Sequence, residues 1–86
     1  MIKLREDSVT WQVVDDEIVC LDLARSEYLS INASGAALWQ QLVDGAEIDA
    51  LVATLMQTFG IDAKIAEPDV RDFVAMLGER RLLAST

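Results

Sequence analysis

The sequence predicts a small α+β domain in which a three-stranded antiparallel β-meander precedes three helices. Two observations carry this prediction. Short runs of β-branched and aromatic residues separated by tight reversals fill the first third of the chain, and apolar residues then recur at helical spacing. The chain has 86 residues, is 52% hydrophobic and contains only four Gly and one Pro. This composition indicates one packed domain over residues 1–86.

The first two strands are expected at Val9–Val14 and Glu17–Leu23. Only Asp15 and Asp16 separate them, so they form an antiparallel hairpin with a two-residue turn. A short polar segment then reverses the chain again, and Glu27–Ile31 follows as the third strand. The three strands form a meander.

The third strand alternates, which places Leu29 and Ile31 on one face and Tyr28 and Ser30 on the other. In a meander this strand is an edge, whose free N–H and C=O groups can pair with another chain. It contains no Pro, and Glu27 is its only charged residue. The alternative is that a helix or the C-terminal tail covers this edge.

Asn32 is placed to cap a first helix that extends to about Val43 and ends at Gly45. Its inner face consists of Gly35, Leu38, Trp39 and Leu42.

The second helix shows the clearest helical periodicity, and Gly60 ends it. Its apolar stripe is predicted to be core and consists of Ile48, Leu51, Val52, Leu55, Met56 and Phe59.

The third helix is predicted to begin near Pro68, since proline suits the first helical turn, and to end near Glu79. Its buried stripe consists of Val70, Phe73, Val74 and Leu77. One flank of that stripe carries Asp69, Met76 and Arg80.

The charge of the chain argues against nucleic acid and anionic membranes as partners. Fifteen acidic residues against seven basic ones give a net charge of -8, whereas phosphate binding needs Lys and Arg. The helical part is shaped like a winged helix-turn-helix, but the second helix carries Asp49 and no Lys or Arg. A basic peptide or protein surface fits better. No apolar run approaches the ~20 residues of a membrane span and no signal-peptide pattern opens the sequence, so a cytoplasmic location is expected.

The residue types also argue against an enzyme. Cys20 is the only cysteine and there is no His, so we expect no intrachain disulfide, no metal site and no cofactor. We interpret Cys20 as a small packed residue. The acidic pairs Asp15 with Asp16 and Asp69 with Asp72 lie in a turn and on a helix surface, where solvation prevents the pKa difference that acid/base catalysis requires.

Several short motifs, in order along Val9 to Leu83, resemble the PqqD-like family. This family comprises the coenzyme PQQ synthesis protein D and the peptide-recognition domains of ribosomal peptide pathways, including the B1 proteins of lasso peptide biosynthesis. The pattern enters the first helix with LN-x-x-G-x-x-(I/L)-W, continues with DG, and ends in DV-x-x-F-(L/V)-x-x-L. Here its positions are Ile31, Asn32, Gly35, Leu38, Trp39, Asp44, Gly45, Asp69, Val70, Phe73, Val74 and Leu77.

The resemblance implies a non-catalytic domain that binds the leader segment of a precursor peptide. The leader joins the third strand as an added strand, the third helix forms the other wall of the groove, and a separate maturation enzyme receives the peptide. The YLSIN segment and the GAALWQQL helix resemble the lasso type more than the PQQ type. The enzyme of the lasso type is a cysteine-protease-like leader peptidase. The expected peptide-binding residues are Glu27, Tyr28, Leu29, Ser30, Ile31, Asp69, Asp72, Phe73, Met76, Leu77 and Arg80.

Other interpretations remain open at this point. Phe73 and Leu77 share the apolar stripe of the third helix and so fit the core as well as a groove. Asp69 and Asp72 fit a role in offsetting the helix dipole in the first turn. A PQQ-type chaperone would serve a radical SAM enzyme, and a winged-helix interaction or regulatory module would pair its edge with itself or with another protein. The sequence leaves the oligomeric state open.

Overall fold

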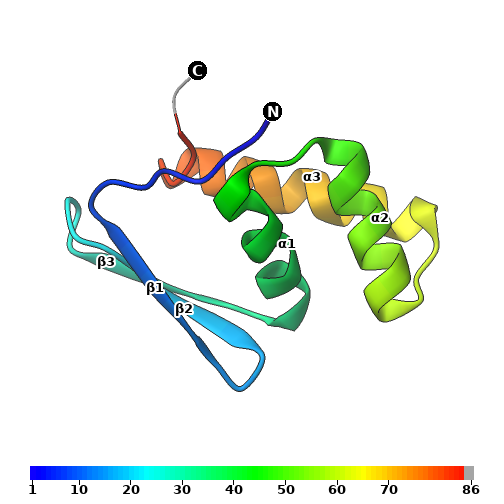
Figure 1. Ribbon diagram of the computed structural model, residues 1–86, viewed down its shortest axis with the longest axis horizontal. Coiled ribbons are helices and arrows are strands. Elements are labelled where there is room, and N and C mark those ends of the chain that lie inside the picture. The colour runs from blue at the N-terminus through cyan, green and yellow to red at the C-terminus, as the bar shows by residue number, and fades with distance from the viewer. Residues whose placement is uncertain (85–86) are drawn as a thin grey trace.

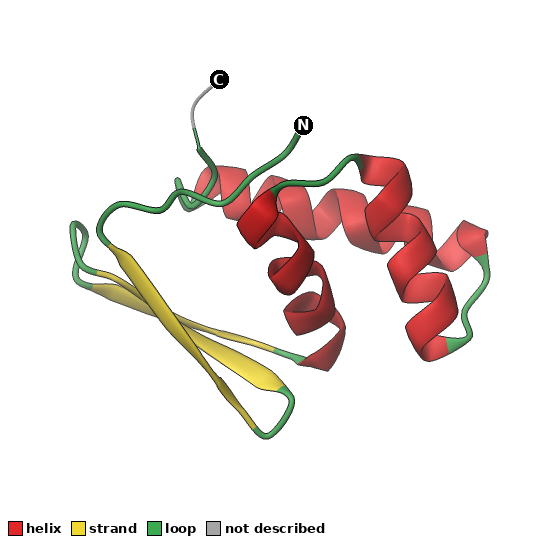
Figure 2. Cartoon of the chain, in the orientation of Figure 1, coloured by secondary structure: helices red, strands yellow, loops and turns green. Residues whose placement is uncertain are grey.

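Three antiparallel strands form one side of the molecule and three helices form the other (Figures 1 and 2). The computed structural model describes residues 1–84. The strands are β1 (Val9–Val14), β2 (Glu17–Asp22) and β3 (Glu27–Ile31), in the order β1-β2-β3. This confirms the predicted meander, with β2 one residue shorter than expected.

The register of the sheet gives it one buried and one exposed face. Cys20 lies opposite both Trp11 and Leu29, and Asp22 lies opposite Glu27. Ile18, Cys20 and Asp22 alternate inward along β2 and are buried beneath the helices. Tyr28 is on the outer face and is 74% exposed, as its alternation with Leu29 predicts.

The hairpin turn between β1 and β2 contains two residues with left-handed backbones. Asp15 has φ 52° and Asp16 has φ 67°. Positive φ at both central residues is the turn geometry that matches the twist of the flanking strands. Aspartate tolerates this conformation better than most residues, which explains a tight turn without glycine.

The helices are α1 (Ala33–Asp44), α2 (Ile48–Phe59) and α3 (Ala63–Glu79). Asn32 caps α1, because its side-chain oxygen accepts a hydrogen bond from the Gly35 N–H at 3.0 Å. Gly60 follows α2 in the left-handed conformation with φ 65°. The caps and stops predicted for α1 and α2 are therefore confirmed.

The predicted start of α3 is wrong, because the helix begins five residues before Pro68. Asp62 caps it instead, and its carboxylate accepts from the Lys64 N–H at 3.1 Å. Pro68 lies in the second turn on the exposed side of the helix, where its missing N–H affects only the carbonyl four residues earlier. Asp69 and Asp72 consequently lie beyond the first turn, so the helix-dipole role does not apply to them.

The core forms around α1, which packs on the inner face of the sheet and on α2. Leu38, Trp39 and Leu42 are almost fully buried. The prediction that the whole apolar stripe of α2 is core is wrong at its C-terminal end, because Met56 is 38% and Phe59 is 41% exposed. α2 packs against α1 and α3. These two helices cover less than the full width of the apolar stripe of α2.

The two ends of the described chain pair with each other. Leu4 bridges to Leu83, and the Ala84 N–H donates to the Lys3 carbonyl at 2.8 Å. The N-terminal segment and the described end of the chain lie near each other, above α1 and α3 in Figure 1. Among residues 1–84, no helix is long and apolar enough to cross a membrane.

Candidate functional site

The outer edge of β3 is open in the part of the chain that the structure describes. β3 pairs with β2 only, and the segment after α3 pairs with the N-terminal residues rather than with β3. Leu29 is half-buried and Ile31 is 3% exposed, so these inward side chains fix the strand on the core. The backbone of β3 is thus held in place while its edge is accessible.

Two hollows lie between the β3 side of the molecule and α3. The first is a cavity of about 10 Å³, where Glu27, Tyr28 and Leu29 face Arg80. The second is about 280 Å³ and lies between the start of α1 and Phe73. The C-terminal end of α3 therefore lies near the start of β3, and the middle of α3 lies near its end. Together the open edge, the two hollows and α3 form a groove, called here the β3–α3 groove.

The structure brings most of the predicted peptide-binding residues to this groove. Glu27, Tyr28, Leu29 and Arg80 line its narrow end, and Asp69, Asp72 and Phe73 line its wide end. Ser30 is exposed on the outer face of β3, and Met76 is half-buried on α3.

Two of the predicted residues lie in the core instead. Leu77 is fully buried and Ile31 nearly so. The side chain of Leu77 therefore packs against the core, as the apolar stripe of α3 also allowed. Ile31 offers the groove its backbone rather than its side chain.

Gly35 sets how closely α1 approaches the groove. A Cβ atom at this position would lie 2.6 Å from Ile31 Cγ2 and 2.9 Å from Phe73 Cε1. Such contacts are too short for a methyl group in a packed core. Glycine therefore lets the end of β3, the start of α1 and the ring of Phe73 meet at one point.

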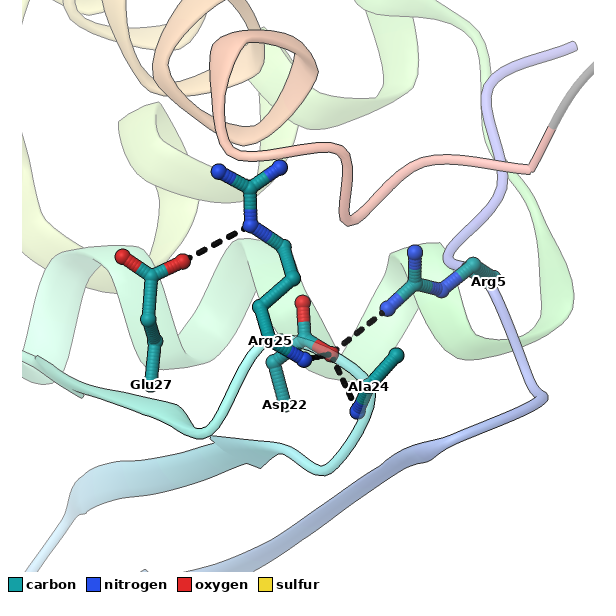
Figure 3. A network of polar contacts seen from close by, with 5 residues as sticks. All are labelled: Arg5, Asp22, Ala24, Arg25 and Glu27. Carbon is teal, nitrogen blue, oxygen red and sulfur yellow. Dashed lines mark hydrogen bonds and ion pairs between the residues drawn. The ribbon is translucent and has the colours of Figure 1, made fainter.

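A polar network holds the start of β3 (Figure 3). Asp22 Oδ1 accepts from the N–H groups of Ala24 at 3.1 Å and Arg25 at 3.3 Å. The same oxygen lies 3.0 Å from Arg5 Nη2, in an ion pair whose side chains are only 5% and 22% exposed. Arg25 Nε in turn donates to Glu27 Oε1 at 2.8 Å. The turn between β2 and β3 is thus tied to the N-terminal segment.

Sequence reasoning missed Arg5 and Asp22. The available signal was the alternation in β2, where Asp22 follows Ile18 and Cys20 on the inward face. A carboxylate on a buried face requires a partner, and Arg5 supplies it from outside the sheet.

The Cys20 thiol is buried and lines the narrow end of the groove. Burial raises the pKa of the Cys20 thiol, the Asp22 carboxylate raises it further, and the Arg5 guanidinium opposes both. The thiol is therefore neutral and unreactive at physiological pH. Among residues 1–84, no group of three or more His, Cys, Asp or Glu residues is placed to hold a metal ion.

Comparison with known proteins agrees with this geometry. The family model for coenzyme PQQ synthesis protein D (PqqD) matches residues 17–83. The chain belongs to the PqqD family. A comparison with curated protein sequences gave no significant match.

Two solved structures share the fold of this PqqD-family chain over nearly its whole length. TbiB1 in complex with the TbiA(beta) leader peptide is 30% identical, with a TM-score of 0.86 over 98% of this chain and 96% of that one. A lasso peptide synthetase B1 complexed with the leader peptide is 25% identical, with a TM-score of 0.84 over 98% of both chains. The chain is thus similar to proteins that were solved with a bound leader peptide.

Proposed function

We propose that this chain is a non-catalytic recognition domain that binds the leader segment of a ribosomally made precursor peptide. The leader adds to the free edge of β3 as an antiparallel strand, and α3 forms the opposite wall. The observation that carries the proposal is the open, firmly anchored edge of β3 beside two hollows on α3. Its support outside this chain is the similarity to two proteins solved with leader peptides.

The groove offers a peptide both backbone pairing and side-chain selection. Main-chain hydrogen bonds to β3 give affinity for many sequences, whereas side-chain pockets give specificity. The half-buried ring of Phe73 provides an apolar wall at the wide end, and the adaptable side chain of Met76 lies one turn further along α3. Asp69 and Asp72 favour a basic peptide residue at the wide end, and Arg80 favours an acidic one at the outer rim of the narrow end.

We further propose that the domain delivers the bound leader to a separate processing enzyme of the lasso leader-peptidase type. Its contribution is tethering, because holding the substrate next to an enzyme raises the effective concentration without any catalytic group. The network around Asp22 and the cap at Asn32 keep β3 rigid, which lowers the ordering cost of binding.

Binding measurements with defined peptides test this function. The probes are the TbiA(beta) leader peptide and the leader of any small precursor peptide that a gene next to this one is found to encode, each fluorescently labelled and followed by anisotropy. Saturable binding is expected, and Arg80→Ala and Met76→Ala each weaken it by about 10-fold if they act as anchors. Absence of binding by both peptides contradicts the proposal.

Arg71→Ala is the matched control for Arg80→Ala. Arg71 is an exposed arginine of α3, the helix that Arg80 follows; among residues 1–84 it pairs only with Glu67 at 3.4 Å, and its removal should change affinity by less than about twofold. Equal losses for the two variants would indicate a general charge effect rather than a site. If peptide also leaves the β3 amides unmoved in NMR spectra, self-pairing of the edge becomes the explanation, and sedimentation then detects dimers.

A further inference from the structure

The narrow end of the β3–α3 groove reaches a buried carboxylate. Its cavity lies between Glu27, Tyr28 and Leu29 on one side and Arg80 and Leu82 on the other. Asp22 and Cys20, from the inward face of β2, line the same cavity. A volume of about 10 Å³ accommodates one water-sized group. The cavity therefore has room for the tip of a single side chain.

One oxygen of that carboxylate has no hydrogen-bond donor. Asp22 Oδ1 accepts hydrogen bonds from two backbone N–H groups and lies 3.0 Å from Arg5 Nη2. Asp22 Oδ2 is buried and, like Arg5 Nε and Nη2 of the same ion pair, has no hydrogen-bond partner among residues 1–84. The side chain is 5% exposed. Figure 3 shows Oδ2 pointing away from the turn, toward the segment that follows α3, which is where Arg80 and Leu82 line the cavity. A buried unpaired acceptor of this kind is costly, and a ligand that supplies a donor gains what the free protein lacks.

The register of the sheet defines which side chain reaches this oxygen. Asp22 lies opposite Glu27, so both side chains project from the inward face. A peptide residue that pairs next to Glu27 lies two strand spacings from Asp22, roughly 9.6 Å. Serine and threonine are too short for that distance. The side chain must be long and must pass beneath β3.

The surrounding charges favour an uncharged donor. The Asp22 carboxylate is balanced by Arg5, and Glu27 is balanced by Arg25 at 2.8 Å, while Arg80 adds a further positive charge at the rim. A lysine or arginine tip would meet the Arg80 guanidinium, while Arg5 and Arg25 already balance the two carboxylates, and a carboxylate tip would meet the unpaired oxygen of Asp22. A tyrosine hydroxyl or a glutamine amide avoids both conflicts.

We propose that Asp22 is a specificity-determining residue whose Oδ2 accepts a hydrogen bond from a long, uncharged, donor-tipped side chain of the peptide paired with β3. This inference rests on the proposed function, because it requires a peptide strand at that edge. It adds a polar selection step to a groove whose other contacts are backbone pairs and apolar walls.

Selection from a display library of random peptides tests the proposal whatever the sequence of the natural leader. The baits are the wild-type protein, Asp22→Asn and the matched control Asp16→Asn. The first replacement keeps an acceptor for the turn but changes Oδ2 into an amide donor. The control makes the same charge change at an exposed hairpin residue outside the groove. Wild type and the control should enrich tyrosine or glutamine at one fixed position, and Asp22→Asn should lose that preference.

Affinities of an enriched peptide then give the size of the effect. Exchanging its donor residue for a shape-matched residue without the donor, tyrosine for phenylalanine or glutamine for methionine, should weaken binding to wild type by about 10-fold or more. The same exchange should change binding to Asp22→Asn by less than about twofold, as a double-mutant cycle requires. Identical preferences for wild type and Asp22→Asn overturn the inference while leaving the proposed function intact. Failure of wild type to enrich any peptide overturns both.

A second readout uses only the wild-type protein and so stays decisive if Asp22→Asn does not fold. The carboxyl carbon resonance of Asp22 reports directly on its hydrogen bonds. The donor-bearing peptide should shift this resonance, and its shape-matched counterpart without the donor should not. Equal shifts with both peptides overturn the inference.

Discussion

β1 and β3 are the two edges of the same sheet, and within residues 1–84 each pairs only with β2. β1 (VTWQVV) has no charged residue and is exposed at five of its six positions. It begins after Ser8 and ends before Asp15, and both of these residues have left-handed backbones. β3 instead starts at the Asp22 network and continues directly into the Asn32 cap of α1. The chain fixes both ends of β3 on other elements, whereas β1 ends in an exposed turn.

The space beside each edge also differs. Beside β1, Trp11 packs edge-to-face against the core residue Trp39, with ring centroids 6.1 Å apart, and the adjoining hollow of about 150 Å³ is bounded by the N-terminal segment. Beside β3, the wide hollow is bounded by α3 and the narrow one by Arg80 and Leu82, which follow that helix. Composition alone therefore does not make an edge strand a binding site. Fixed ends and the position of α3 and the segment after it distinguish β3 from the more apolar β1, whose hollows face α1.

Breaking the anchor at the start of β3 should have the largest effect on stability. Arg5→Gln leaves the buried Asp22 carboxylate without its counter-ion and should lower the free energy of unfolding by about 2–3 kcal/mol, somewhat less than a fully buried pair because Arg5 is partly exposed. Hydrogen exchange at Arg25 and Glu27 should rise more than in β1. Lys3→Gln, which breaks an exposed pair with Glu6, is the control and should cost less than about 0.5 kcal/mol. Equal losses of the free energy of unfolding in the two variants would show that the Asp22 carboxylate does not need Arg5 as its counter-ion.

Removing an aromatic ring from the β3–α3 groove should weaken leader binding, whereas removing one from the hairpin side of the molecule should not. Phe73→Ala should weaken leader binding by about 10-fold or more, as expected for an aromatic anchor. Phe59→Ala removes an equally large ring from the hollow beside the β1–β2 hairpin and should change affinity by less than about twofold. Anisotropy titrations compare the two variants. A larger loss for Phe59→Ala would place the peptide on the hairpin side.

Gly35→Ala should test the packing where β3 meets α1. The added methyl group would collide with Ile31 and Phe73, so we expect a loss of about 1–3 kcal/mol in urea unfolding, typical of overpacking. Gly78→Ala on α3 is the control. The nearest atom to its added methyl group is Leu83 Cδ1 at 3.9 Å, and alanine should stabilise the helix by about 0.5–1 kcal/mol. A neutral Gly35→Ala would show that Phe73 is free to move away.

The smallest effect concerns Cys20, which lies on β2 between the two edges. Its raised pKa means that the folded protein keeps the thiol neutral while the unfolded chain ionises it. Stability due to this group is therefore present below the ordinary thiol pKa and declines as the pH rises above about 8.5. Iodoacetamide should label the native protein far more slowly than the urea-unfolded chain. Rapid native labelling would contradict the burial of Cys20.

Most of the fold was predictable because local signals agreed with the tertiary structure. The alternation in β3 and the cap at Asn32 are examples, and both are confirmed. The start of α3 was not predictable from Pro68, since proline is tolerated in an exposed early turn and Asp62 was the actual cap. The exposure of Met56 and Phe59 depends on how far α3 covers α2, which periodicity cannot show.

The candidate site was predictable in its elements but not in its polar contacts. The edge strand and the flank of α3 follow from pattern, and the structure places Arg80 and Phe73 beside the groove. The pairing of Asp22 with Arg5 joins residues far apart in the chain. The alternation in β2 indicates that Asp22 needs a partner, but a single sequence does not identify which basic residue supplies it.

NMR of a complex between isotope-labelled protein and unlabelled leader peptide tests the central claim most directly. We expect cross-strand contacts between peptide protons and the backbone of β3, and further contacts with α3. The amides of β1 should keep their free-state positions. Peptide contacts along β1, or binding that leaves the β3 amides unmoved, would contradict the assignment of β3 as the receiving edge.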